Sequence, residues 1–388
     1  RIAVDRTFGQ PPLRVFVARL RQSVFRFTIP FENLEQKPVI VVDPSPVRHA
    51  GRRRGRGSER LESTPLRVAA ADVSGRLPLM RVSDYLSDIA EVTLNAVVEL
   101  AWRHLVERHG RPTGCLQGVA CERGFGVIAY GKLGGLELGY GSDLDLVFLH
   151  AGVDGQTQGG PRPIDNAQFF NRLGQRVIHL LTAHTRAGRV YEIDMRLRPS
   201  GISGVLVQHV EAFRDYQLNH AWTWEHQALI KARPVCGERL ITSHFEAVRA
   251  EALSQRRAAA KLRAEVADMR TRMRAEHHRP EPGMFDLKQG PGGIVDIEFL
   301  VQYLVLRHAY RHPELVRWTD NVRLIQTLIG SAVLNEYLAH VLKHAYLIYR
   351  AAAHQLSLQE APARVPAEKF APLQQRIRQI WGALFPGR

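Results

Sequence analysis

Two aspartates, Asp143 and Asp145, are separated by one leucine at the start of an apolar run that ends near His150. Side chains alternate along a strand, so a strand here would project both carboxylates from one face, about 6.7 Å apart. Carboxylates that close repel each other unless a cation lies between them. Mg²⁺ is usually bound by one or two carboxylates together with substrate phosphate oxygens, so the spacing predicts a magnesium site for phosphoryl or nucleotidyl transfer.

A glycine-rich turn precedes the aspartates and follows a predicted strand at residues 125–130. Glycine lets backbone N–H groups approach a phosphate closely, so Gly131 and Gly141 are candidate phosphate contacts. Lys132 and Ser142 are predicted to add side-chain contacts. The alternative is a surface strand that ends in two solvated aspartates, which is common for an isolated Asp-x-Asp pair. The glycine turn and the two strands favour the transfer site.

Four longer sequence motifs make the interpretation of the Asp-x-Asp pair more specific. They are GKLGGLELGYGSDLDL at 131–146, DMRLRPSG at 194–201, AWTWEHQALIKARPV at 221–235 and FDLKQGPGGIVDIEFLVQYL at 285–304. Together they resemble the glutamine synthetase adenylyltransferase family, within the DNA polymerase β-like nucleotidyltransferase superfamily, and the likeness extends from about residue 66 to about residue 359. In the superfamily, Gly or Ser usually follows the glycine that Gly131 matches. Lys132 departs from that pattern but belongs to the family's own GKLGG word, which leaves the exact phosphate ligand open.

The resemblance implies transfer of AMP from ATP to a tyrosine hydroxyl of glutamine synthetase, with Mg²⁺ held by Asp143, Asp145 and a third carboxylate. Asp194, on a predicted strand at residues 189–197, is the candidate third ligand and the candidate base for the tyrosine proton. Full-length members carry two related halves, one for each direction of the reaction. The word GYGS at 139–142 resembles the C-terminal, adenylylating half. Phosphorolytic removal of AMP and a noncatalytic regulatory module remain as alternatives.

Several other side chains are candidates for contacts with the nucleotide. The two arginines of the word RLR would share a face of their strand, although pairing with Glu192 or Asp194 is the alternative. Two tryptophans could stack on adenine, but core packing is the favoured interpretation for both. The cations expected to reach the phosphates are Arg196, Arg198, Lys231 and Arg233, and the tryptophans are Trp222 and Trp224.

The chain has 388 residues and a net charge of +15. About half of that excess precedes Leu66, and the rest is spread along acid-rich helices or lies in candidate phosphate motifs, so nucleic acid is not the expected substrate. Three cysteines are too few and too far apart for zinc, and we expect reduced thiols in a cytoplasmic protein. No apolar run is long enough to span a membrane, and residues 1–10 lack the apolar segment of a secretory signal.

The order of elements predicts an α+β fold. Residues 1–64 are proline-rich and lack periodicity, so we expect poor order there apart from a strand at 39–43. The chain begins without methionine and is expected to be a fragment, and residues 1–64, which do not align with the family, could reflect a frame error. Residues 65–250 are predicted to form a polymerase β-like domain with a small mixed sheet flanked by helices, led by a helix that Ser83 caps and that continues to Gly110.

Residues 251–388 are predicted to form an all-helical C-terminal bundle. It resembles the helical appendage of the uridylyltransferase that modifies the nitrogen-regulatory PII protein, which makes PII a candidate partner. A charged helix at 256–274 is expected to be solvated or to link the domains. Asp296 and Glu298 would diverge on a helix, so we expect structural roles, one of them binding Lys288 or an arginine across the joint. The loop at 151–162 could be a mobile lid, but a plain exposed loop is favoured.

Overall fold

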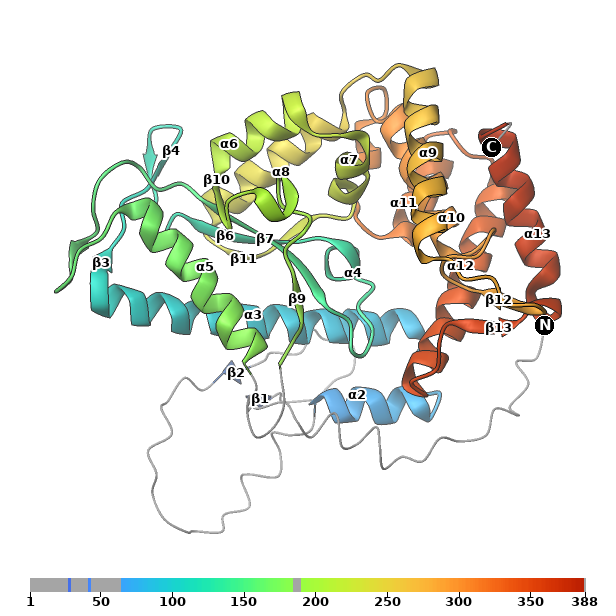
Figure 1. Ribbon diagram of the computed structural model, residues 1–388, viewed down its shortest axis with the longest axis horizontal. Coiled ribbons are helices and arrows are strands. Elements are labelled where there is room, and N and C mark those ends of the chain that lie inside the picture. Colours follow the sequence, from blue (N-terminus) through green and yellow to red (C-terminus); the bar gives the residue numbers. More distant parts are fainter. Residues whose placement is uncertain (1–26, 29–40, 43–63, 184–189, 387–388) are drawn as a thin grey trace, which may run out of the picture.

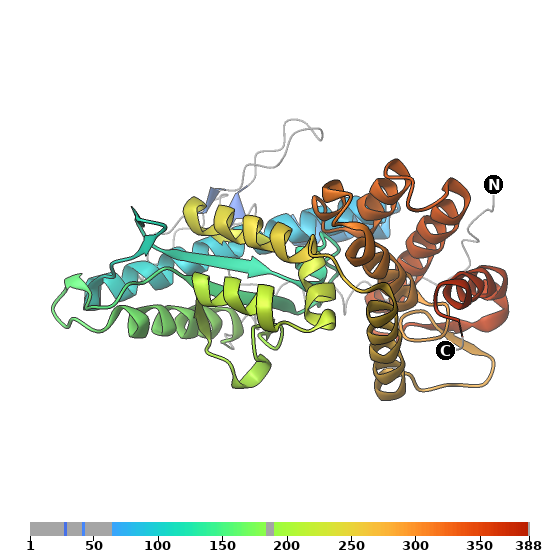
Figure 2. The same ribbon diagram turned by 90° about the horizontal axis from the view of Figure 1, so that it is seen from above.

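The computed structural model describes residues 27–28, 41–42, 64–183 and 190–386. A region built on a β-sheet and a helical region lie side by side (Figure 1), and the same division is visible from above (Figure 2). The predicted α+β class is confirmed. Of the strand expected at 39–43, the structure describes β2 (Val41–Val42), which pairs with β1 (Phe27–Thr28), and the rest of residues 1–63 lie outside the described ranges.

A five-stranded mixed sheet forms the core of the first region, in the order β10–β7–β6–β11 with β9 also paired to β7. Strand β7 runs antiparallel to β6 and parallel to β9 and β10. It is buried along its length except at Asp145, which is half-buried, so the predicted central strand is confirmed. The strands are β6 (Phe125–Ala129), β7 (Leu144–His150), β9 (Ile193–Asp194), β10 (Val207–His209) and β11 (Arg233–Gly237).

Side chains of β6 and β7 alternate between two hydrophobic clusters, one on each face of the sheet. Val127 and Phe148 belong to the cluster that includes α3 and α5, whereas Ile128 and Val147 belong to the cluster that includes α6 and α8. Helices therefore cover both faces of the sheet (Figure 1), as the sequence analysis predicted. Their bounds are α3 (Leu79–His109), α5 (Asn166–Thr182), α6 (Val210–Asp215) and α8 (Arg239–Leu253).

The long leading helix exists, but the predicted cap at Ser83 is wrong. Helix α3 begins four residues earlier, directly after Pro78, whose extended backbone occupies the N-cap position. Ser83 is instead buried inside the helix and accepts a hydrogen bond from Arg350 Nη2 at 3.0 Å. Because Arg350 comes from the helical region, Ser83 serves to join the two regions.

Two other local predictions change in the structure. The strand expected at 189–197 is reduced to β9, because the backbone turns after Met195, and residues 184–189 lie outside the described ranges. The loop at 151–162 is fastened to the end of α3, since β8 (Gln158–Gly159) pairs with β3 (Gly110–Arg111). That attachment favours the exposed loop over a mobile lid.

The C-terminal bundle is helical, as predicted, apart from one short sheet formed by β12 (Met284–Asp286) and β13 (Arg364–Pro366). Its helices are α9 (Ala259–His277), α10 (Ile294–His308), α11 (Asn321–Gly330), α12 (Glu336–Leu358) and α13 (Ala367–Leu384). The remaining elements are α2 (Thr64–Val73), α4 (Gly131–Gly134), α7 (Thr223–Ile230), β4 (Cys115–Leu116), β5 (Val119–Ala120), a π-helical turn (Tyr216–His220) and 3₁₀ turns (Gly201–Ser203 and Pro313–Val316).

Helix α9 was predicted to be a solvated face or a linker between domains, and the structure shows that one side of it is buried. Arg270 is fully buried and donates to Asp296 Oδ1 at 2.6 Å, and Arg274 reaches the same carboxylate at 2.7 Å. Leu262 and Val266 of α9 are buried as well. An arginine is tolerated in this position because a paired carboxylate accompanies it. The predicted structural role of Asp296 is therefore confirmed.

The cysteines Cys115, Cys121 and Cys236 are free, as predicted. In the part of the chain that the structure describes, none of the helices is both long and apolar enough to pass through a bilayer.

Candidate active site

The glycine turn after β6 is the short helix α4, and it lies against Asp145. Gly131 has a φ of 54°, a left-handed conformation that favours glycine. A Cβ atom built on Gly131 would lie 2.0 Å from Asp145 Oδ2, so no larger residue fits without displacing that carboxylate. The structure thus gives Gly131 a role beside the carboxylate, and its predicted phosphate contact stays a prediction.

Asp145 and Asp194 are brought together by the sheet. They are direct partners on the parallel strands β7 and β9, so their side chains share one face. Asp143 precedes β7 by one residue. Burial is the largest cause that raises the pKa of Asp145 to about 6, and the neighbouring Asp143 and Asp194 contribute to the same rise, against the opposing effect of Lys132 and Lys231. The three predicted carboxylates are therefore close enough to repel one another.

Asp194 already has a cationic partner. The Arg196 backbone N–H and Nε atoms both donate to its carboxylate at 2.8 Å, and these bonds hold the pKa of Asp194 below its usual value. Of the two roles weighed for Arg196, pairing with Asp194 is the one observed. The Arg196 side chain is 74% exposed, so it is the outermost member of the group. Arg198 donates to the carbonyls of Met195 and Gly204.

The donor set suits Mg²⁺, because it consists of carboxylates whose mutual repulsion a cation would relieve. Within residues 64–183 and 190–386, no three His, Cys, Asp or Glu side chains form a group that could hold a metal ion, so the three aspartates are not arranged as a ready cage. Mg²⁺ does not require one, because it takes one or two protein carboxylates and completes its shell with phosphate oxygens and water. Asp143, Asp145 and Asp194 are the residues that would hold it.

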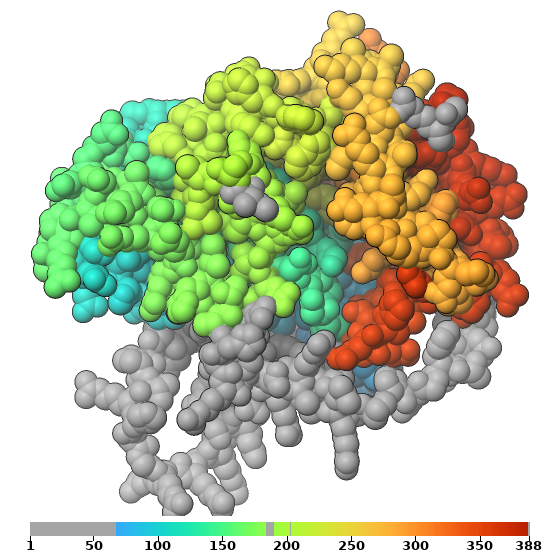
Figure 3. Space-filling model, in the orientation of Figure 1, coloured from blue at the N-terminus to red at the C-terminus, as the bar shows by residue number. Residues whose placement is uncertain are grey.

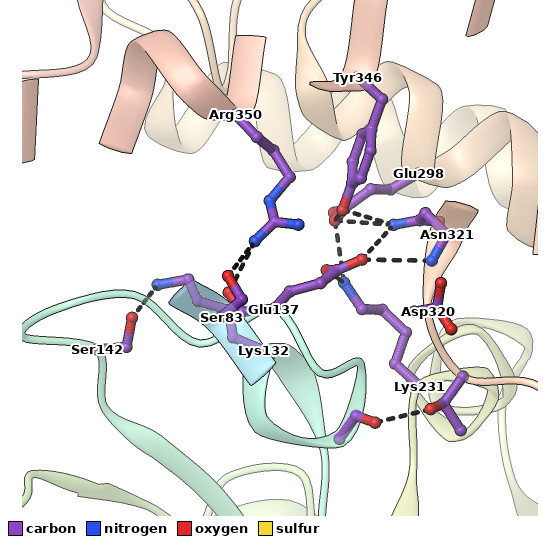
Figure 4. Close-up of polar contacts among 12 residues, drawn as sticks. Ser83, Lys132, Glu137, Ser142, Lys231, Glu298, Asp320, Asn321, Tyr346 and Arg350 are labelled. Carbon is purple, nitrogen blue, oxygen red and sulfur yellow. Dashed lines mark hydrogen bonds and ion pairs between the residues drawn. The ribbon is translucent and has the colours of Figure 1, made fainter. Parts of the chain in front are cut away.

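Lys132, Gly141 and Ser142 form the rim next to the carboxylates. Lys132 Nζ lies 3.4 Å from Ser142 Oγ (Figure 4), and Ser142 Oγ accepts from the Gly139 backbone at 3.2 Å. Lys132 and Gly141 are exposed. A Cβ atom on Gly141 would meet nothing within 4 Å, although its φ of 66° favours glycine. The rim is open to a ligand on the side that faces solvent.

Lys288, which the sequence analysis considered only as a partner for Asp296 or Glu298, lies near enough to Lys132 and Asp143 for their charges to affect its pKa. Its side chain keeps an exposed surface, yet the surrounding protein desolvates the ammonium group. That desolvation and the charge of Lys132 lower the pKa of Lys288, and Asp143 acts in the opposite direction. The motif DLKQGPGG before α10 was the only hint, and nothing in its spacing indicated that Lys288 would lie near Lys132 and Asp143.

Lys231 and Arg233, both predicted to reach phosphates, have protein partners instead. Lys231 is buried and lies 2.5 Å from Glu137 and 3.0 Å from Glu298. Burial alone would lower the pKa of Lys231, but the two glutamates raise it well above its usual value. Arg233 pairs with Glu91 at 2.5 Å and donates to the carbonyls of Leu133 and Gly134. Contacts of either with phosphate remain a prediction.

Lys231 is the centre of a buried network that joins the two regions (Figure 4). Asn321 donates to Tyr346 Oη at 2.9 Å and to Glu298 Oε1 at 3.3 Å. Glu298 from α10 binds Lys231 from the end of α7, so it has the predicted structural role across the joint, but with Lys231 in place of the predicted Lys288 or arginine. Sequence analysis missed Glu137, although it stands inside the word GKLGGLELG, because a glutamate beside glycines gives no sign of burial.

The two tryptophans differ in their surroundings. Trp222 is 66% exposed, so the predicted core packing is wrong for this residue. It occupies the N-cap position of α7, which holds its ring outside the helix. Trp224 is half-buried.

Comparison with known proteins identifies the family. Residues 59–248 match the model of glutamate-ammonia ligase adenylyltransferase, and residues 260–382 match that of PII-uridylyltransferase. A bifunctional glutamine synthetase adenylyltransferase/adenylyl-removing enzyme of Pseudomonas putida is 49% identical over 82% of this chain and 34% of the relative. The chain belongs to the glutamine synthetase adenylyltransferase family.

Other relatives in this family agree. An enzyme of the same name from Nitrosococcus oceani is 51% identical over 82% of the chain. One from Pseudomonas syringae pv. tomato is 46% identical over 98% of the chain, so that alignment reaches into residues 1–64. The chain spans about a third of the length of these curated relatives, at 33% to 38%. The match to the uridylyltransferase model confirms the predicted likeness of the C-terminal bundle.

Proposed function

We propose that the chain transfers AMP from ATP to a tyrosine hydroxyl of glutamine synthetase and releases pyrophosphate. The observation that carries the proposal is the pairing of Asp145 with Asp194 across β7 and β9, with Asp143 beside them and Gly131 fitted to the Asp145 carboxylate. Relatives bear the name glutamine synthetase adenylyltransferase/adenylyl-removing enzyme, which supplies the substrate. ATP is the nucleotide that an adenylyltransferase uses.

Asp143, Asp145 and Asp194 would hold Mg²⁺ at the phosphates. The metal would neutralise charge on the attacking and leaving oxygens. Asp194 is kept ionised by Arg196, which suits a ligand more than a proton acceptor. The role of Asp194 as the base for a tyrosine of pKa near 10 stays a prediction.

The rim would bind and orient the triphosphate. Lys132, Ser142 and the backbone at Gly141 lie next to the carboxylates, and Lys288 adds a second ammonium group. The exposed Arg196 would be able to bind a phosphate in place of Asp194, because a guanidinium binds either anion through the same paired N–H groups. Positioning and charge neutralisation are the main demands of such a reaction.

Incubation with labelled ATP, Mg²⁺ and glutamine synthetase tests the proposal. We expect label from the α-phosphate, but not from the γ-phosphate, on a tyrosine of glutamine synthetase. No turnover of ATP under any condition would favour the noncatalytic module. Extension of an RNA 3′ end would favour a nucleic-acid substrate instead.

We propose the adenylylating direction because the word GYGS at 139–142 resembles the adenylylating half of the family. Adenylylation and phosphorolysis share in-line geometry at one phosphorus, so the fold accommodates both. Adenylylated glutamine synthetase and inorganic phosphate, without ATP or pyrophosphate, provide the test. Rapid release of ADP together with no forward transfer would reverse the assignment.

The remaining proposals concern the setting of the reaction. We propose PII protein as a regulatory partner, because residues 260–382 match the model of PII-uridylyltransferase. A catalytic domain over 65–250 and a helical domain over 251–388 remain our proposed boundaries. We propose a cytoplasmic location, where ATP and glutamine synthetase meet.

A further inference from the structure

A cavity of about 520 Å³ lies between the start of α9 and the end of α10, away from the candidate active site. Its lining is strongly basic and, within the described residues, includes no carboxylate. The lining residues are Arg256, Arg257, Ala258, Ala259, Arg307, His308, Tyr310 and Arg311. None of them belongs to the carboxylate group or its rim.

The four arginines lack acidic partners. None of them takes part in the ion pairs recorded for the described residues, whereas Arg270 and Arg274 further along α9 share Asp296. Arg257 is half-buried and donates only to backbone carbonyls and His226. Burial lowers its pKa to about 10, which indicates a guanidinium desolvated without a counter-ion.

The geometry concentrates this charge. Arg256 and Arg311, from different elements, both lie over the ring of Tyr310, at 5.9 Å and 5.2 Å from its centroid. The pKa of His308 is lowered first by burial and then by the positive charge of Arg307, His312 and Arg311. The field inside the cavity is therefore positive from several sides.

Two simpler explanations cover only part of the group. Arg307 and His308 occupy the last turn of α10, where cations complement the helix dipole. Free solvation accounts for exposed arginines such as Arg311. Neither explains Arg257, which is half-buried in the segment before α9 and would normally avoid further cations.

We propose that this cavity binds a ligand that carries two or more phosphate groups, as a site separate from the one that transfers AMP. Guanidinium groups from the segment before α9 and from the end of α10 match a polyphosphate, because each can donate two parallel hydrogen bonds. The cavity volume lies within the usual range for small-molecule sites, roughly 300–1,000 Å³. Its small lining favours a compact anion over an extended acidic protein surface.

A neighbouring hollow suggests where a nucleoside would lie. This hollow has about 680 Å³ and shares Arg256, Arg257 and Ala258 with the basic cavity. It also includes Trp222, whose 66% exposed indole offers a stacking surface. Inorganic polyphosphate and a nucleoside polyphosphate would bind the arginines through the same phosphate groups. Only the nucleoside polyphosphate has a base that could stack on Trp222.

Calorimetric titration with tripolyphosphate tests the site, in EDTA so that no metal assists binding at the aspartates. The double variant Arg307→Gln/Arg311→Gln should bind at least about tenfold more weakly than wild type, because it removes two charge-assisted contacts. The control Arg108→Gln/Arg376→Gln removes equal charge from exposed positions elsewhere and should change affinity less than about twofold. Equal losses in both double variants, or no binding by wild type, would overturn the proposal.

Further variants guard against misfolding and identify the source. Arg256→Gln changes an exposed residue and should weaken binding for the same reason as Arg307→Gln/Arg311→Gln, because it also removes a charge-assisted contact. If Trp222→Ala weakens binding of a nucleoside triphosphate but not of tripolyphosphate, the ligand is a nucleotide. If Trp222→Ala has the same effect on binding of the nucleoside triphosphate and of tripolyphosphate, the site recognises the phosphate groups alone. Binding of only long polyanions would refute a small-ligand site.

The activity assay keeps this proposal independent of the proposed function. Transfer of AMP without added polyphosphate should be unchanged in Arg307→Gln/Arg311→Gln, because neither residue touches the aspartates or their rim. Loss of basal transfer in that variant, with the fold intact, would contradict a separate site.

Discussion

The carboxylate group at β7 and the network around Lys231 place similar side chains under opposite conditions. At β7, Asp143 and Asp145 lie beside Asp194, which forms a close ion pair with Arg196. In the network, Glu137 and Glu298 share Lys231. Figure 3 shows the sheet region in cyan to yellow-green against the helical region in gold to red. The network joins these regions, because Lys231 at the end of α7 pairs with Glu298 of α10.

The two carboxyls that best express this contrast are Asp145 and Glu137. Burial raises the pKa of both, but Asp143 and Asp194 add to the effect at Asp145, whereas Lys231 and Arg350 reverse it at Glu137. A balanced cluster stabilises the fold as it stands. An unbalanced cluster costs stability unless a cation arrives, which is the property expected of a site that binds one.

The largest expected effect is on activity at Asp145. Asp145→Asn should lower the rate of AMP transfer by about a hundredfold or more, because it removes a charged ligand at the reacting phosphate. The fold should persist, since the change relieves repulsion. The measurement is label transfer at saturating Mg²⁺, with the exposed loop variant Asp154→Asn as the matched control. Near-normal transfer by Asp145→Asn would end the metal assignment.

The next effect is on stability at Glu137. Glu137→Gln should lower the free energy of unfolding by about 3 kcal/mol, because it breaks a buried ion pair and leaves Lys231 with Glu298 alone. The control is Glu99→Gln, which removes an ion pair with Arg123 that is 40% exposed and should cost about 1 kcal/mol or less. Urea unfolding of both variants makes the comparison. Equal losses of unfolding free energy in the two variants would mean that the buried network around Lys231 does not stabilise the fold more than an exposed ion pair does.

A smaller effect is expected in the pH dependence of stability. The pKa of Asp145 is about 6 in the folded protein and about 3.9 in the unfolded chain, so the folded state binds this proton more tightly. Its stabilising contribution is complete below pH of about 4 and is lost as the pH rises through about 6. Relative to Asp145→Asn, the wild type should lose about 2 kcal/mol over that interval.

Urea unfolding of wild type and Asp145→Asn, in EDTA at several pH values, measures that difference while other titrating groups cancel. Added Mg²⁺ should stabilise the wild type at neutral pH and leave the variant nearly unchanged. A difference that is independent of pH would mean that the carboxylates at β7 do not repel one another.

The sequence predicted the parts of this comparison that are local. Glycines, alternating apolar residues and the Asp-x-Asp spacing identified β6, β7 and the carboxylates, because backbone and strand geometry act over a few residues. It did not predict that Lys231 would be buried or that Trp222 would be exposed. Those outcomes depend on Glu137, Glu298 and α7, which the chain brings together from distant positions.

The smallest effect on stability is expected at Arg196, and it separates the two roles of that residue. Arg196→Gln should change the free energy of unfolding by no more than about 0.5 kcal/mol, because the side chain is 74% exposed. If Arg196 turns to phosphate when metal binds, the KM for ATP should rise by up to about tenfold with less change in kcat. Arg196→Lys should recover only part of that loss, since lysine lacks the paired N–H groups. The control is Arg214→Gln, an exposed arginine paired with Glu251. An unchanged KM would mean that Arg196 serves only to neutralise Asp194. In that case the charge of one of the three aspartates would already be balanced by the protein itself.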